Sequence, residues 1–281
     1  MNLSLIIPTL NNESTIEKCL KSLKPQLGKN DEILVIDSYS KDKTIKIAKK
    51  YTNTILKTRG NRSIARNIGW KKSKNEIIIF IESDSIYKKD YIKVVKKRMS
   101  DKSVDCILDK REHYKPNNWV SRTLQQEFEK RYAENFVPVT AWIYRKKVLE
   151  EVKGFDKNLE YAEDADIGIR LRKAGYDIVF APKAVQYHLG EPGTLEEVIK
   201  RSWKYGQNMK KFYAKNGSAP TLKNILFICS IIFPPLLLLI FITNMIRYDT
   251  LSPEQRIKLS FISIIRNAAF AVSYTLSILD F

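Results

Sequence analysis

The chain has 281 residues, enough for one large domain or two smaller ones with a buried core. Lysine and arginine number 49 against 31 acidic residues, so the formal net charge is +18. This bias favours anionic partners such as phosphorylated substrates, nucleic acid or an anionic membrane. The cysteines, Cys19, Cys106 and Cys229, show no metal-ligand spacing, and their odd number argues against a disulfide framework.

Four short runs of β-forming residues alternate with helical patterns in the first half of the chain. The runs are LSLIIP at 3–8, EILVID at 32–37, NTILKT at 53–58 and EIIIFIE at 76–82. Strand–helix alternation of this kind predicts an α/β fold with a parallel sheet and right-handed crossovers. In such sheets, ligands bind beyond the carboxyl ends of the strands.

Polar residues follow three of these four runs directly. Thr9 and the stretch 11–13 follow the first run, Asp37 and Ser38 close the second, and E-S-D-S at 82–85 closes the fourth. A lone E-S-D-S is ordinary turn and capping chemistry, but convergence from three strands on one rim favours a site. No G-x-G-x-x-G or P-loop motif follows a strand, which argues against both of those phosphate cradles. Carboxylates at the rim would suit Mg²⁺ or Mn²⁺, which prefer oxygen ligands and substrate phosphates.

The second half contains one short amphipathic helix with acidic residues at its start. The pattern DADIGIRLRKAGY at 164–176 predicts this helix, with Gly175 as its C-terminal cap. Asp164 lies at its beginning, where a carboxylate caps free amides and the helix dipole favours the ionised form. Asp166 and Arg170 stand four residues apart, so an ordinary helix-surface ion pair is the alternative to a chemical role for Asp166.

A basic helix is predicted over 194–215. Arg201 and Lys204 flank Trp203 there, and apolar or aromatic side chains beside clustered cations suit a helix on an anionic interface. The alternative is a core-packed helix with a solvated basic face.

Two apolar stretches follow. Residues 224–246 carry no charge, which is long enough to cross a hydrocarbon core of about 30 Å. Pro234 and Pro235 leave a bent or re-entrant segment open. The stretch 259–279 contains Arg266, which is costly in a membrane unless it faces protein or a lipid phosphate. It is either an interfacial helix or the return limb of a hairpin.

Several pieces of the chain, in this order, resemble the family-two, inverting nucleotide-sugar glycosyltransferases with the GT-A fold. They are LSLIIPTLNNESTIEKCLKSL, EILVIDSYSKDKT, RGNRSIARNIGWKKS, IIIFIESDS, GFDKNLEYAEDADIGIRLRKAGY and YHLG, within about residues 3–215. The metal motif more commonly reads D-x-D and here reads E-S-D, and where an acidic pair often stands only Asp37 remains.

The resemblance implies a Rossmann-like, mostly parallel sheet flanked by helices, followed by a membrane-associated helical segment. We expect a glycosyltransferase domain over 1–215, including the basic helix 194–215, and membrane-embedded or interfacial helices over 222–281.

The resemblance also implies roles for individual residues. Asp84 would hold a catalytic Mn²⁺ or Mg²⁺, with Glu82 and His188 as further metal ligands. Asp164 would be the catalytic base, with Asp166 as the second choice. Residues expected to contact the nucleotide-sugar donor are Pro8, Thr9, Asn11, Glu13, Asp37, Arg66, Asn67, Glu82 and Ser83. Residues expected to contact the acceptor or lipid are Arg201, Trp203, Lys204 and Arg266.

The predicted function is metal-dependent, inverting transfer of a sugar from a nucleotide-diphosphate sugar to a lipid-linked acceptor, a polyprenyl phosphate or lipid-linked glycan. The expected location is the cell membrane, with the catalytic domain facing the cytoplasm. One alternative is a polysaccharide glycosyltransferase for which the tail is only an anchor, and another is a non-catalytic nucleotide-sugar-binding protein. A nucleic-acid-binding protein would explain the charge but not the carboxylates, which repel phosphates. No helix-turn-helix, RNP or zinc signature supports it, so no nucleic-acid partner is expected.

Overall fold

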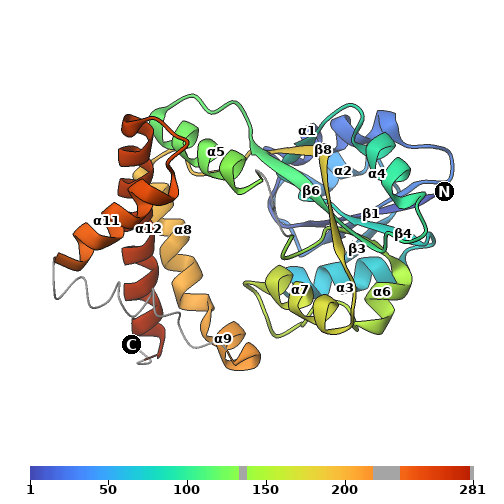
Figure 1. Cartoon of the computed structure of the whole chain (residues 1–281). Helices are drawn as coiled ribbons and strands as arrows, with labels where there is room; N and C mark the ends of the chain where they lie inside the picture. Colours follow the sequence, from blue (N-terminus) through green and yellow to red (C-terminus); the bar gives the residue numbers. More distant parts are fainter. Residues whose placement is uncertain (133–137, 218–234, 279–281) are drawn as a thin grey trace. The chain divides into compact units, whose positions relative to one another are not determined.

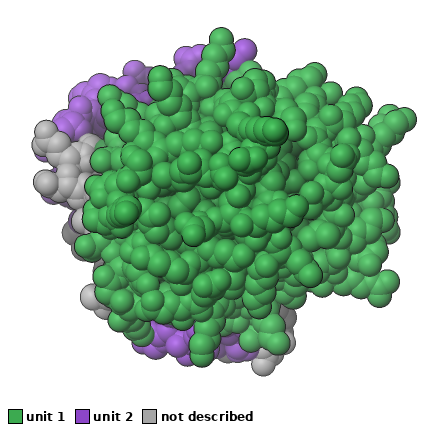
Figure 2. Space-filling model, turned by 90° about the vertical axis from the view of Figure 1, so that its right-hand side faces the viewer, with its two compact units in different colours: residues 1–114, 132–190 green, residues 115–131, 191–281 purple. Residues whose placement is uncertain are grey.

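The computed structural model describes residues 1–132, 138–217 and 235–278, and Figure 1 shows the elements they form. The chain divides into two compact units. Unit 1 comprises Met1–Tyr114 and Tyr132–Gly190, and unit 2 comprises Lys115–Arg131 and Glu191–Phe281. Figure 2 shows the two units in space-filling form, the first in green and the second in purple.

Unit 1 is built on an eight-stranded mixed sheet. Its strands lie in the order β3-β2-β1-β4-β7-β6-β8-β5. Their bounds are β1 Leu3–Thr9, β2 Glu32–Asp37, β3 Ile55–Lys57, β4 Ile77–Phe80, β5 Ser85–Tyr87, β6 Cys106–His113, β7 Ile143–Arg145 and β8 Ile178–His188. The four predicted strands, β1 to β4, are confirmed and pair in parallel. The antiparallel neighbours β5 and β7 were not predicted.

Helices cover both faces of this sheet. They are α1 Ile16–Leu23, the short 3₁₀ helix η1 Lys24–Gln26, α2 Thr44–Ala48, α3 Arg62–Lys72, α4 Tyr91–Met99, α6 Lys146–Glu151 and α7 Glu163–Lys173. In β1, Leu5 and Ile7 pack into the apolar cluster that contains α1 and α4, and Ile6 packs into the cluster that contains α3 and α7. Because successive strand residues face opposite sides, an unbroken apolar run is what a doubly covered strand requires.

Unit 2 is helical. Its helices are α5 Trp119–Arg131, α8 Leu195–Asn208, α9 Lys210–Asn216, α11 Pro235–Arg247 and α12 Pro253–Ile278. Val198 of α8, Ile262 of α12, and Val120 and Leu124 of α5 form one small apolar cluster. The basic helix over 194–215 therefore belongs with the C-terminal helices, unlike the expected division between residues 215 and 222.

The helix α12 combines the length and apolar composition of a membrane-spanning helix with a partly buried ion pair. It is the one helix among the described residues long and apolar enough to cross a membrane. Its Arg266 makes two hydrogen bonds, of 2.8 and 2.9 Å, to the Glu127 carboxylate of α5. This bidentate pair offsets the cost of an arginine in an apolar helix. Of the two alternatives for Arg266, the structure shows the protein partner. Of the predicted span 224–246, residues 224–234 lie outside the described residues, and residues 235–246 lie within α11.

The helices α8 and α12 cross with their backbones in close approach at Gly206. A Cβ atom added at Gly206 would lie 1.9 Å from Ser273 Oγ and 2.5 Å from the carbonyl oxygen of Phe270. Both Gly206 and Ser273 are buried. Glycine is therefore needed here for packing between the helices.

Replacing Gly206 by leucine should destabilise the protein by about 1–3 kcal/mol, because the side chain would force α8 and α12 apart. Leucine has the better helix propensity by about 1 kcal/mol, so any loss of stability reports the clash. Thermal unfolding followed by circular dichroism measures it, with the exposed neighbour Gln207→Leu as the control. Equal midpoints for the two variants would contradict this packing.

Candidate active site

The carboxyl ends of the parallel strands β1 and β2 lie side by side, and Asp37 is the last residue of β2. The two ends pair directly, with Thr9 opposite Asp37 in the register. Asp37 is fully buried, and its carboxylate accepts hydrogen bonds from the Ser40 backbone N–H (3.1 Å) and hydroxyl (2.5 Å). Thr9 donates its hydroxyl proton to Asn12 Oδ1 at 3.0 Å, and Pro8 precedes it within β1. Asp37 therefore holds the start of the β2–α2 loop in place at this edge of the sheet.

Two loops beyond this edge are tied together by side chains predicted to contact the donor. Asn11 Oδ1 accepts from the Lys41 N–H at 2.9 Å, and the Asn11 N–H donates to Ser40 Oγ at 2.9 Å. Glu13 Oε2 accepts from the Lys43 N–H at 2.9 Å. Asn11 and Glu13 thus hold the β1–α1 loop against the β2–α2 loop.

The E-S-D segment after β4 meets the end of β8. The unpredicted strand β5 pairs antiparallel with β8 and places Ser85 opposite His188. The Leu189 N–H also donates to the Asp84 carbonyl at 2.8 Å. As a result His188 Nε2 lies 3.3 Å from Asp84 Oδ2 and 4.0 Å from Glu82 Oε2. Ser83 is buried between the two acids. The sequence prediction that these three groups share one place is consistent with this geometry.

The two carboxylates suit a divalent cation, although the protein alone does not complete a coordination shell. Glu82 Oε2 is buried without a hydrogen-bond partner, while Glu82 Oε1 lies 3.5 Å from Arg111 Nη1. Within the described ranges, no three His, Cys, Asp or Glu side chains form a group that could hold a metal ion. Mg²⁺ and Mn²⁺ commonly use one or two carboxylates and take their remaining ligands from substrate phosphates and water. An open pair of acids fits that chemistry.

The His188 ring has a defined orientation. The Gly190 N–H donates to His188 Nδ1 at 3.2 Å, so Nε2 carries the proton and faces Asp84. Binding of a cation by Nε2 would require the other tautomer and the loss of the Gly190 contact. Binding of a cation by the two carboxylates requires no change of tautomer. In this tautomer His188 orients Asp84, and its role as a third metal ligand stays a prediction.

Asp84 is poised to be negatively charged. Burial opposes ionisation, but the hydrogen bond from His188 and the positive charge of Arg111 hold the pKa of Asp84 below its usual value. Its side chain is 35% exposed, so the carboxylate is both charged and reachable.

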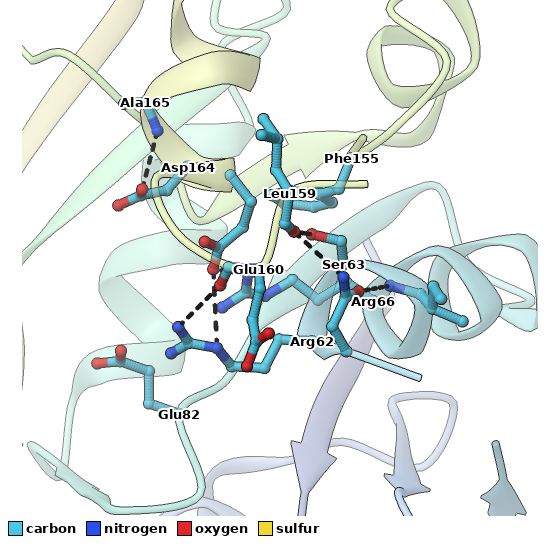
Figure 3. A network of polar contacts seen from close by, with 12 residues as sticks. Arg62, Ser63, Arg66, Glu82, Phe155, Leu159, Glu160, Asp164 and Ala165 are labelled. Carbon is cyan, nitrogen blue, oxygen red and sulfur yellow. Dashed lines mark hydrogen bonds and ion pairs between the residues drawn. The ribbon is translucent and has the colours of Figure 1, made fainter. Parts of the chain in front are cut away.

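The acids at the start of α7 differ sharply in environment. Asp164 is half-buried, and its Oδ1 accepts from the Ala165 N–H at 2.9 Å (Figure 3). Burial, and then the negative charge of Glu163, raise the pKa of Asp164, whereas Arg66 acts in the opposite direction. Asp166 is fully buried and pairs with Arg170 Nη2 at 2.8 Å. The ion-pair alternative for Asp166 is therefore what the structure shows, and Asp164 is the more accessible carboxylate.

Arg66 and Asn67, predicted to contact the donor, are engaged within the protein. Arg66 is buried, with Nη1 2.6 Å from Glu163 Oε1. Asn67 exchanges two hydrogen bonds with the Phe155 backbone, at 2.7 and 2.9 Å, and accepts a third from Trp70 Nε1 at 3.0 Å. Asn67 thus fixes the loop before α7.

Two further residues at this edge were missed by sequence reasoning. Arg62, the first residue of α3, is labelled in Figure 3. Its side chain is 53% exposed and lies 3.9 Å from Glu163 Oε1. Tyr39 is 48% exposed, with the Arg59 guanidinium 5.3 Å from its ring centroid. Only their positions in the sequence could have indicated these two residues, because each comes shortly after a predicted parallel strand.

The predicted acceptor residues on α8 are described within unit 2. Arg201 Nη1 pairs with the Glu191 carboxylate at 2.6 Å. Trp203 and Lys204 are exposed on the same helix. Arg266 is engaged by Glu127 rather than presented to an acceptor.

Sequence comparison identifies the family of this chain. The model of "Glycosyl transferase family 2" matches residues 4–153, more than half of the chain. A curated relative is the O-antigen chain rhamnosyltransferase RfbN of Salmonella typhimurium, 28% identical over 208 residues. That alignment covers 67% of this chain and 66% of the relative, so this chain spans a little less than two thirds of it.

Solved structures show the same fold. PcManGT, a mannosyltransferase from Pyrobaculum calidifontis in complex with GDP-Man and Mn²⁺, superposes with a TM-score of 0.65 at 17% identity, over 99% of this chain and 87% of that chain. S. aureus TarS 1–349 in complex with UDP-GlcNAc gives 0.56 at 18% identity, over 100% of this chain and 92% of that chain. At these identities the likeness concerns the fold alone, which is GT-A-like. The chain belongs to glycosyl transferase family 2.

Proposed function

We propose that this protein transfers a sugar, with inversion, from a nucleotide-diphosphate sugar to a hydroxyl of a lipid-linked glycan, using Mn²⁺ or Mg²⁺. The observation that carries the proposal is the pair of acids after β4. Asp84 is charged and accessible, and the neighbouring Glu82 Oε2 is buried without a hydrogen-bond partner. Nucleotide-sugar complexes of structural neighbours support the donor class.

On the donor side of the reaction, a positively charged group must lie beside the leaving diphosphate to offset its negative charge. Asp84 and Glu82 would hold the cation, with His188 beside them. When bound, the cation supplies a Lewis acid that offsets the charge developing on the leaving phosphate. The side chain of Arg62, half exposed at the same edge, can donate hydrogen bonds from its guanidinium group to the diphosphate.

The acceptor side needs a group that removes a proton from the attacking hydroxyl. Asp164 can serve because its surroundings raise its pKa towards the working pH, which strengthens it as a base. Attack from the face opposite the leaving group inverts the anomeric centre. Asp166 is poorly suited because Arg170 already neutralises it.

The nature of the acceptor is proposed from the relatives and from unit 2. RfbN is named for the O-antigen chain, and a second relative, TarS, is a poly(ribitol-phosphate) β-N-acetylglucosaminyltransferase. The apolar helix α12 and the exposed Trp203 and Lys204 of α8 support attachment at a membrane. We place the catalytic unit on its cytoplasmic side, where basic residues gather.

Replacing Asp84 by asparagine should abolish the Mn²⁺-dependent part of donor binding, since the charged ligand is lost while the shape is kept. A thermal-shift screen of UDP-, GDP- and dTDP-sugars with Mn²⁺ first identifies the donor. Calorimetric titration of that donor, with and without Mn²⁺, then compares Asp84→Asn with Asp177→Asn, a substitution at an exposed aspartate. Metal-dependent affinity that survives in Asp84→Asn would remove the metal role.

Replacing Asp164 by asparagine should leave donor affinity nearly unchanged and lower transfer by about a hundredfold or more, the usual scale for loss of a general base. Asp166→Asn should instead lower the unfolding temperature, because it leaves Arg170 without its carboxylate. Transfer rates, donor affinities and unfolding temperatures of both variants test the assignment. If a stably folded Asp166→Asn loses transfer and Asp164→Asn keeps it, the base is Asp166.

A further inference from the structure

The segment before α7 is attached to the start of α3 by side chains of α3 and of its N-cap residue, Asn61. Asn61 Nδ2 donates to the Lys157 carbonyl at 2.9 Å, and Ser63 Oγ donates to the Leu159 carbonyl at 2.9 Å. Arg62 Nη2 lies 3.4 Å from the Glu160 carbonyl (Figure 3). These contacts join positions about a hundred residues apart in sequence. They bring the start of α7 to the same edge of the sheet as α3.

The start of α7 lacks an ordinary cap. Its N-cap residue, Ala162, has no side-chain hydrogen bond to offer and adopts a left-handed backbone with φ of 56°. A non-glycine residue in this conformation is uncommon and persists where its surroundings hold it. The first helical residue, Glu163, supplies that restraint through Arg66. Asp164 is the next residue in the chain.

The Arg66–Glu163 pair is itself closely held. The two side chains are 6% and 5% exposed and meet at 2.6 Å. The Arg66 guanidinium lies 4.8 Å from the Trp142 ring centroid and 5.2 Å from that of Phe155. A buried ion pair of this kind is costly to break, because removing one partner leaves the other charge buried without compensation.

We propose that Arg66 and Glu163 are a positioning pair that holds Asp164 in place and sets the pH range in which it works as the base. The inference rests on the proposed role of Asp164. It gives Arg66 a task other than the donor contact expected from the sequence.

The charges around Asp164 give the pair its effect on pH dependence. Glu163 disfavours the ionised form of Asp164, and Arg66 favours it. Arg62, at the start of α3, lies 3.9 Å from Glu163 Oε1. The hydroxyl of the buried Tyr144 in β7 donates to the Ala141 carbonyl. Arg170 is occupied by Asp166. Loss of either member of the pair would leave an unbalanced charge next to the base.

The signs of the two expected changes are opposite. Without Arg66, the charge of Glu163 is unopposed and the pKa of Asp164 rises, so the acidic limb of the rate profile moves to higher pH. Without the charge of Glu163, Arg66 is unopposed and the limb moves to lower pH. Each shift should be about one pH unit, since a neighbouring charge within a few ångströms moves a carboxyl pKa by that order.

The experiment is the pH profile of kcat for wild type, Arg66→Met, Glu163→Gln and the double variant, measured with the donor found in the thermal-shift screen. Glu163→Gln keeps the size and the acceptor oxygen, so it tests the proposal even if Arg66→Met folds poorly. We expect opposite shifts, a return towards wild type in the double variant, and partial rescue by Arg66→Lys. Lys173→Met removes one exposed charge from the far end of α7 and is the control.

Lower rates without movement of the limb, or shifts in the same direction for both single variants, would overturn the proposal. Asp164→Asn separates this failure from that of the proposed function. If Asp164→Asn keeps full transfer, the base assignment has failed. The other outcome is an inactive Asp164→Asn while the acidic limb of the kcat profile of Glu163→Gln stays at its wild-type pH. In that case only the proposal of the positioning pair is rejected.

Discussion

The burial of β1 and β4 on both faces is the constraint on which the rest of unit 1 depends. Ile6 and Ile78 face one helix layer, and Leu5 and Ile79 face the other. Charged side chains within these strands would meet apolar residues on either side, so their polar residues gather where the strands end. The same constraint directs the acids of the E-S-D segment to one rim. It also explains why the proposed metal-binding acids, Glu82 and Asp84, follow the end of β4 and do not lie within it.

Two acids of this rim have opposite electrostatic surroundings. His188 and Arg111 lower the pKa of Asp84, whereas burial and Glu163 raise that of Asp164. Environments that separate the pKa values of two carboxyl groups commonly assign them to different tasks. Here the charged group suits a cation, and the more basic group suits removal of a proton from a hydroxyl. Both belong to unit 1.

The local features of unit 1 were predictable from sequence, and the long-range ones were not. The four parallel strands and α7 follow from apolar runs and helical spacing, which act over a few residues. The strand β5 has three residues and pairs with β8 a hundred residues later, so no local pattern indicates it. Arg66 pairs with Glu163, and Asn67 hydrogen-bonds to Phe155. Both contacts depend on how a segment about ninety residues later in the chain folds back onto α3. For this reason, the sequence did not indicate these intramolecular contacts of Arg66 and Asn67, and their contact with the donor stays a prediction.

The most direct test of the account is the configuration of the sugar released by the enzyme. With the donor identified by thermal shift and with Mn²⁺ present, proton NMR recorded early in nucleotide-sugar hydrolysis reports the first anomer formed, because water replaces the acceptor. A single base opposite the leaving diphosphate predicts release of the inverted anomer, before mutarotation, and its loss in Asp164→Asn. First release of the anomer with the donor's own configuration would contradict the proposed mechanism.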